Sequence, residues 1–139
     1  MNRPMILVID GQGGRLGALI VERLRAAPCP AEVLAGGTNS AASATRLRAG
    51  ADAAATGEFP VILNAPRAAV IVAPLGAAVA GSMHGEITPA MAEAVGLSAA
   101  EKVLIPSVKC TLHVVGAETH TMPEYAALAA EAALAALEG

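Results

Sequence analysis

The sequence predicts an α/β protein in which one mostly parallel sheet is doubly wound, with helices on both faces. Three observations support this class. Short apolar segments alternate with longer amphipathic segments along nearly the whole chain. The first apolar segment lacks a polar face, as expected for a strand that is covered on both sides. No repeat or linker divides the 139 residues, so we expect a single domain over residues 1–139.

Short apolar segments supply the expected strands. Residues 5–9 and 69–73 are the clearest, because they are rich in β-branched residues and have no polar face. Residues 58–65 fit either a strand or a helix. The full set of expected strands is residues 5–9, 32–35, 51–55, 69–73, 102–105 and 112–115.

Capping residues mark the ends of the expected helices. Gly50 fits a left-handed helix stop, and Thr88 fits an N-cap with proline after it. Gly96 is expected to follow the end of that helix. Thr121 and Glu124 have the spacing of a capping box. The expected helices cover residues 14–27, 39–49, 88–95 and 123–137.

Composition narrows the function classes. The net charge is −3, and Phe59 and Tyr125 are the only aromatic residues, so we expect no nucleic-acid surface. Cys29 and Cys110 lie far apart and form no disulfide framework, which favours the reduced cytoplasm. Residues 68–85 are uncharged, but they contain proline and glycines and little Leu or Ile. We therefore expect a buried strand and loop there, and no contact with a membrane.

A glycine-rich turn follows the first expected strand in the stretch IDGQGGRLG, residues 9–17. Its glycines resemble the G-x-G-x-x-G fingerprint, but the third comes one residue late, at Gly17. Bare amides at a helix start suit a phosphate, and Gly17 lets the helix lie close to the strand. A tight turn without a ligand is the alternative. Gln12, Gly13, Gly14 and Arg15 are expected to hold the phosphate, and Gly11, which makes the tight turn, is the fifth expected cofactor-binding residue there.

Two features complicate a dinucleotide site. Asp10 directly precedes the turn and would repel a pyrophosphate unless a cation or hydrogen bonds offset its charge. Its simpler role is to accept hydrogen bonds from turn amides. In NAD sites, an acidic residue about 20 residues after the glycine turn holds the ribose. This sequence has no such acid, and Thr38 and Asn39 stand there instead. These two side chains suit a ribose or a 2′-phosphate, as in NADP, or else they only cap a helix.

The segment at residues 74–88 is long for a connection between a strand and a helix. We expect it to form a pocket wall or lid in which Gly76 and Ser82 contact the ligand, or else a subunit contact. His84 could donate to a phosphate or move a proton, or be a plain exposed loop residue. Glu86 precedes a helix start, which favours its ionised form. Asp10 and Glu86 are the candidates for acid–base catalysis or cation binding.

Several chemistries are not indicated by the sequence. It has no P-loop lysine motif and no G-x-S-x-G elbow. Tyr125 has no lysine four residues later. Cys110 could have a lowered thiol pKa beside Lys109, but a small buried cysteine is the commoner case. The spacing of His84, Cys110, His113 and His120 matches no standard zinc pattern, so we expect no metal site.

Four blocks of the sequence resemble a small family of uncharacterised bacterial proteins known only as a domain of unknown function. These blocks are IDGQGG near the start, GTN after the second expected strand, ATGE at residues 55–58, and GEITP with MAEA at residues 85–94. The resemblance spans the whole chain. It implies a stand-alone Rossmann-like protein and assigns no reaction or catalytic residue.

Three functions are therefore considered. The first is binding of NAD(P) or another phosphate-bearing nucleotide across the turn at residues 11–17 and the loop at residues 74–88. The second is a non-catalytic sensor or assembly subunit that acts through oligomer or partner contacts. The third is a cation-dependent hydrolase that uses Asp10 and Glu86. We expect a cytoplasmic homo-oligomer in each case, and whether the protein is an enzyme stays open.

Overall fold

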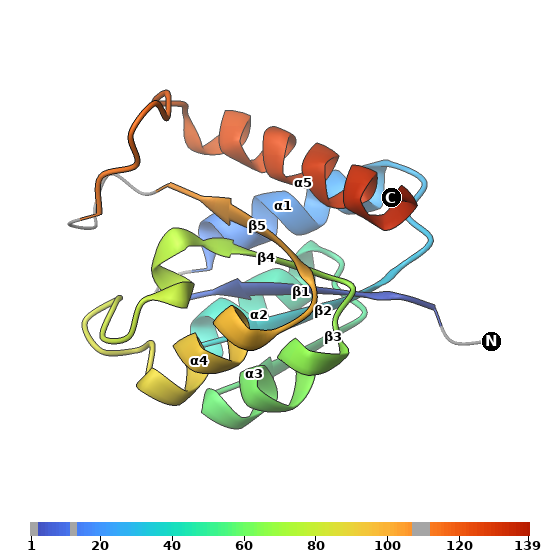
Figure 1. Ribbon diagram of the computed structural model, residues 1–139. Coiled ribbons are helices and arrows are strands. Elements are labelled where there is room, and N and C mark those ends of the chain that lie inside the picture. Colours follow the sequence, from blue (N-terminus) through green and yellow to red (C-terminus); the bar gives the residue numbers. More distant parts are fainter. Residues whose placement is uncertain (1–2, 12–13, 107–111) are drawn as a thin grey trace.

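The computed structural model describes residues 3–11, 14–106 and 112–139. Its strands form one parallel sheet in the order β3-β2-β1-β4-β5 (Figure 1). The predicted single-sheet α/β fold is therefore confirmed. The elements are β1 (Met5–Asp10), α1 (Arg15–Ala26), β2 (Glu32–Gly37), α2 (Ser40–Ala49), β3 (Ala53–Thr56), α3 (Glu58–Asn64), η1 (Ala65–Arg67), β4 (Val70–Pro74), η2 (Leu75–Ala78), α4 (Pro89–Leu97), β5 (Glu101–Ile105) and α5 (Met122–Glu138).

Helices cover both faces of the sheet (Figure 1). Along β1, Ile6 and Val8 pack into the apolar cluster that includes residues of α1 and α5. Leu7 and Ile9 point to the other face, where they pack with residues of α3 and α4. All four side chains are buried, which explains why this strand has no polar face.

The order of the strands reverses beside β1. The chain runs from β1 to β2 and β3 on one side of the sheet, and then crosses to β4 and β5 on the other side. The carboxyl ends of all strands lie at one edge, on the left in Figure 1, where the loop after β4 also lies. Ligands of open α/β sheets bind at this edge, near such a reversal. The fold therefore indicates where to look for a site.

Most predicted helix ends are confirmed. Asn39 accepts a hydrogen bond from the Ala42 amide, Gly50 is left-handed, and Thr121 forms the expected capping box with Glu124. Thr88 likewise caps α4.

Three expectations on element boundaries need correction or completion. Residues 112–115 do not form a strand; Val115 is 89 % exposed, and the chain turns back through an Ala117 to Val114 hydrogen bond. Gly96 lies inside α4 rather than after it, because helical hydrogen bonding continues to Ser98. The ambiguous residues 58–65 form α3 and the start of η1.

The uncharged stretch at residues 68–85 forms β4, η2 and part of the following loop. The side chains of Val70, Ile71, Val72 and Ala73 are buried in the sheet, as expected. In the described parts of the chain, no helix has both the length and the apolar character that crossing a membrane requires.

Gly17 allows α1 to lie directly against the end of β1. A Cβ atom at this position would come 2.6 Å from Cδ of Arg46 and 3.0 Å from Cβ of Asp10. Both neighbours are buried and held by hydrogen bonds. Any side chain at residue 17 would therefore push the helix away from the strand.

We expect Gly17→Ala to lower the free energy of unfolding by about 1–3 kcal/mol, because the added methyl group overpacks this contact. Gly96→Ala is the matched control, because Gly96 is also helical but an added Cβ has no atom within 4 Å. The control should raise stability by up to about 1 kcal/mol through helix propensity. Urea unfolding measures both changes, and equal gains would contradict the proposed close contact.

Candidate functional site

Three loops from different strands meet at Gly11, directly after β1. A Cβ on Gly11 would lie 2.6 Å from Oγ1 of Thr38, 2.8 Å from Oε1 of Glu86 and 2.5 Å from Sδ of Met83. Thr38 follows β2, whereas Met83 and Glu86 belong to the loop after β4. Gly11 is therefore the point at which the glycine turn, the end of β2 and the loop after β4 come together.

The carboxylate of Glu86 is held by the residues that follow β2. The Thr38 hydroxyl donates to Oε1 at 3.0 Å, and Nδ2 of Asn39 donates to Oε2 at 3.1 Å. Glu86, Thr38 and Asn39 are all half-buried, so this carboxylate lies at the surface of the site rather than in the core. The predicted residues Gly11, Thr38, Asn39 and Glu86 thus form one polar cluster.

Asp10 ties the end of β1 to the first turn of α1. Its Oδ1 accepts the Gly11 amide at 2.8 Å, and its Oδ2 accepts the Gly17 amide at 2.7 Å. Its simpler expected role, as an acceptor for turn amides, is confirmed. Burial raises the pKa of the Asp10 carboxyl above its usual value. The two amides and the charge of Arg46 act in the opposite direction.

Arg46 is a buried cation that the sequence pattern did not single out. Its side chain comes from α2 and is fully buried. Nε donates to the Ala42 carbonyl and Nη1 to the Val8 carbonyl, so the guanidinium lies between α2 and β1. Burial lowers the pKa of Arg46 to about 10, although the charge of Asp10 acts to raise it. Asp10 and Arg46 therefore offset each other's charge beneath the turn.

A network of small residues shapes the end of β2. Oγ of Ser43 lies 2.7 Å from Oγ1 of Thr56 and also bonds the carbonyl of Ala55. A side chain on Gly37 would collide with Ser43 and would come 2.9 Å from Nη2 of Arg46. Thr56 belongs to the ATGE block that carries the family resemblance, whereas no sequence pattern indicated Ser43.

The loop after β4 covers the turn in a strained conformation. Met83 and His84 have φ values of 58° and 55°, in the left-handed region that residues other than glycine rarely adopt. Gly76 and Ser82 contact each other within the loop, since a Cβ on Gly76 would lie 3.1 Å from Cβ of Ser82. Their predicted contact with a ligand stays a prediction. His84 itself is exposed.

The remaining predicted phosphate contacts have different surroundings. Gly14 is left-handed at the N-cap of α1 and packs against the backbone of Ala42. Arg15 is exposed on the first turn of this helix. Gln12, Gly13 and Cys110 lie outside the described residues. Within the described ranges, no group of three His, Cys, Asp or Glu side chains could hold a metal ion.

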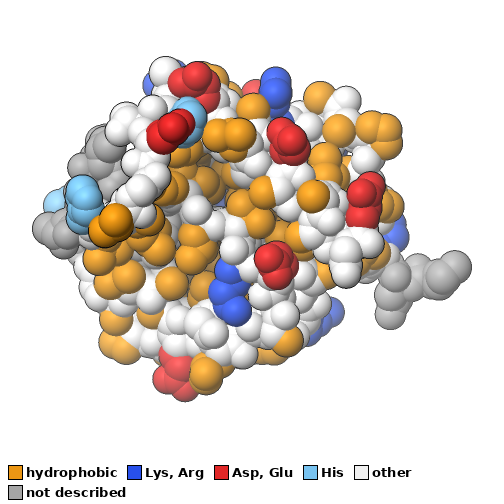
Figure 2. Space-filling model, turned by 45° about the horizontal axis from the view of Figure 1, so that its top comes forward, with side chains coloured by type: hydrophobic (Ala, Val, Ile, Leu, Met, Phe, Trp, Pro, Cys, Tyr) orange, Lys and Arg blue, Asp and Glu red, His pale blue; other side chains and the backbone are white. Residues whose placement is uncertain are grey.

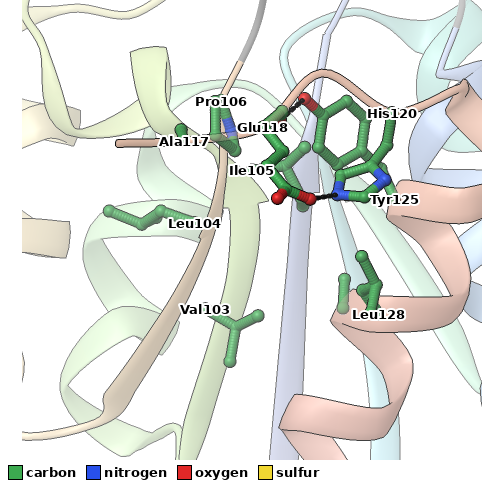
Figure 3. Close-up of a pocket in the computed structure, with 10 residues that line it drawn as sticks. Val103, Leu104, Ile105, Pro106, Ala117, Glu118, His120, Tyr125 and Leu128 are labelled. Carbon is green, nitrogen blue, oxygen red and sulfur yellow. Dashed lines mark hydrogen bonds and ion pairs between the residues drawn. The ribbon is translucent and has the colours of Figure 1, made fainter. Parts of the chain in front are cut away.

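A hollow lies between β5 and the start of α5, away from the cluster around Gly11, and the sequence did not predict it. Its volume is about 250 Å³. Figure 2 shows hydrophobic side chains on the face that carries it. In Figure 3, Glu118, His120 and Tyr125 lie at one end, and Val103 and Leu128 lie at the other. The Tyr125 hydroxyl donates to the Glu118 carbonyl, so the loop before α5 fixes the polar end.

Arg46→Met removes the cation near Asp10 and leaves the Asp10 carboxylate buried. We expect a loss of about 3 kcal/mol or more at neutral pH, the size typical when one of two neighbouring buried charges is removed. The loss should grow as the pH rises above about 3.9, the unfolded pKa of Asp10, and should level off above the raised folded-state pKa. The folded-state pKa of Asp10 already exceeds its unfolded value of about 3.9, and removing Arg46 raises it further.

The pH dependence has this sign because a raised carboxyl pKa costs stability as the group ionises. The cost begins at the unfolded pKa and is complete above the folded pKa. Urea unfolding across this pH range measures it. The control is Arg48→Met, because Arg48 lies on the same helix and is exposed. A pH-independent deficit in Arg46→Met would contradict the coupling to Asp10.

Comparison with known families supports the resemblance seen in the sequence blocks. The model of the family described as "Domain of unknown function (DUF3842)" matches residues 5–138. The matched range includes every strand of the sheet and the cluster around Gly11. A search of curated proteins gave no match. The chain therefore belongs to the DUF3842 family.

Proposed function

We propose that the protein binds a nucleotide, such as NAD(P), or a comparable phosphate-bearing small molecule at the carboxyl edge of β1, β2 and β4. The observation that carries this proposal is the convergence of three loops on Gly11. Thr38 and Glu86 place polar groups beside a residue that has no side chain. Ligands of α/β proteins bind at such a position, next to the reversal of strand order.

The start of α1 supports a phosphate at this edge. The amides of Arg15 and Leu16 belong to the first turn, where they have no partner within the helix. Such amides and the helix dipole attract anions. The exposed guanidinium of Arg15 adds positive charge. Gly11, Gly14 and Arg15 are the proposed phosphate contacts.

Asp10 is compatible with a phosphate in this arrangement. Its two oxygens already accept the amides of Gly11 and Gly17, and Arg46 lies on its buried side. The protein itself therefore offsets the negative charge that would otherwise repel the ligand. Because both oxygens are engaged, the arrangement favours ligand binding over the cation-dependent hydrolase. Catalysis by Asp10 or Glu86 stays a prediction.

The loop after β4 acts as the cover of the proposed site. Met83 and Glu86 occupy the space beside Gly11, so a ligand enters when the part of this loop that carries Met83 moves outwards. The left-handed conformations of Met83 and His84 are strained. A change in the shape of the loop relieves this strain, which makes the movement easier. Gly76 and Ser82 are proposed to contact the ligand within the moved loop.

Calorimetric titration with NAD, NADP, ATP, GTP and coenzyme A tests this function. We expect at least one of these ligands to bind, and we expect Gly11→Ala to weaken that binding by about tenfold or more. The added methyl group would displace Thr38, Met83 and Glu86 from the cluster.

Gly96→Ala is the control for this titration, because it adds the same methyl group away from the site. Thermal unfolding of both variants checks that they remain folded at the titration temperature. The proposal fails if the wild-type protein binds none of the five ligands. It also fails if a folded Gly11→Ala variant binds as tightly as the control.

A further inference from the structure

We infer, on the basis of the proposed nucleotide site, that Glu86 selects a ligand whose ribose carries a free 2′-hydroxyl. The ligand class is then an NAD-type or ADP-ribose-type nucleotide rather than its 2′-phosphorylated form. The inference rests on where Glu86 lies relative to β2 and Gly11 and on its charge.

The position of Glu86 fits a group that binds ribose. In dinucleotide sites of this architecture, an acid about 20 residues after the glycine turn accepts hydrogen bonds from the ribose hydroxyls. Here Thr38 and Asn39 follow β2, and neither is acidic. Both donate to the Glu86 carboxylate, at 3.0 and 3.1 Å. The loop after β4 therefore delivers a carboxylate to the place where the sequence after β2 lacks one.

The second spatial relation joins Glu86 to the glycine turn. Oε1 of Glu86 lies 2.8 Å from the position of a Cβ on Gly11. Met83 lies 2.5 Å from the same position, so a ribose beside the turn would meet this carboxylate when Met83 moves outwards and Glu86 keeps its bonds to Thr38 and Asn39. Two adjacent ribose hydroxyls can each donate a hydrogen bond to one carboxylate, which accepts on both oxygens.

The charge of Glu86 opposes a 2′-phosphate at the same place. The second pKa of a phosphate monoester is about 6. The group therefore carries a charge of about −1.5 to −2 near pH 7. Arg46 is fully buried and donates to the carbonyls of Ala42 and Val8. It is therefore not placed to receive a 2′-phosphate at the surface.

Asn39 shows that the carboxylate is oriented rather than loosely placed. Its Oδ1 accepts the Ala42 amide at 2.9 Å and caps α2, while its Nδ2 donates to Glu86. The amide is thus fixed at both ends. Asn39 therefore holds Glu86 against the start of α2. Because the carboxylate has a fixed position, a single substitution of Glu86 tests the effect of its charge.

Calorimetric titration with two matched ligand pairs tests this inference. The pairs are NAD with NADP, and ADP-ribose with its 2′-phosphate. We expect the wild-type protein to bind the member without 2′-phosphate about tenfold or more tightly, because like charges at contact distance repel. Glu86→Gln keeps the shape and hydrogen-bonding length of the side chain but removes the charge. We expect this variant to lose most of the preference.

Glu93→Gln is the matched control, because Glu93 is an exposed glutamate on α4. It should keep the full wild-type preference. An equal affinity of the wild-type protein for both members of a pair overturns the inference, and so does a preference that Glu86→Gln leaves unchanged. In both cases nucleotide binding itself stands.

Failure of the two proposals can be told apart. If neither pair binds but another nucleotide of the panel does, the assignment of an NAD-type or ADP-ribose-type ligand is wrong and the nucleotide site stands. If no nucleotide binds, both proposals are wrong. Thermal unfolding of Glu86→Gln confirms that it is folded before its affinities are compared.

Discussion

The hydrogen bonds from the Gly11 and Gly17 amides to Asp10 determine the shape of the carboxyl edge. They fix the last residue of β1 to the first turn of α1, across a turn that has few side chains of its own. The close approach is possible because Gly17 has no Cβ, and Arg46 fills the space on the buried side. A carboxylate in this position is costly to bury, and the amides and the guanidinium together compensate for that cost.

Much of the fold could be predicted because its signals are local. The alternation of apolar and amphipathic segments is sufficient for the parallel sheet, and the caps at Asn39, Thr88 and Thr121 act within a few residues of themselves. Part of the site could also be predicted from the sequence. The carboxyl ends of parallel strands share one edge, so Gly11 and Thr38 had to lie near each other. The contact of Thr38 with Glu86 required the course of the loop after β4.

Other features depend on contacts that no local pattern specifies. Arg46 lies on the same buried face of α2 as Ala42 and Ser43. A cation among small residues on one helix face was the only pattern that could have indicated that Arg46 is buried. Recognising it required knowledge of the distant Asp10. The hollow beside Tyr125 is lined by residues of β5, of the segment at residues 117–120 and of α5, so it exists only where these parts of the chain come together. The strand predicted at residues 112–115 is absent for the same reason. An apolar segment forms a strand only where a neighbouring strand is free to pair with it, and the local pattern does not show this.

The origin of Glu86 in a loop has a consequence for how the family can diverge. The sheet and the glycine turn form the platform, while the carboxylate near Thr38 arrives on a separate segment between β4 and α4. Insertions and deletions are tolerated in surface loops far better than in strands. Relatives with a shorter or longer segment here would keep the same platform while the side chains beside Gly11 differ, so the polar cluster and the architecture can evolve independently.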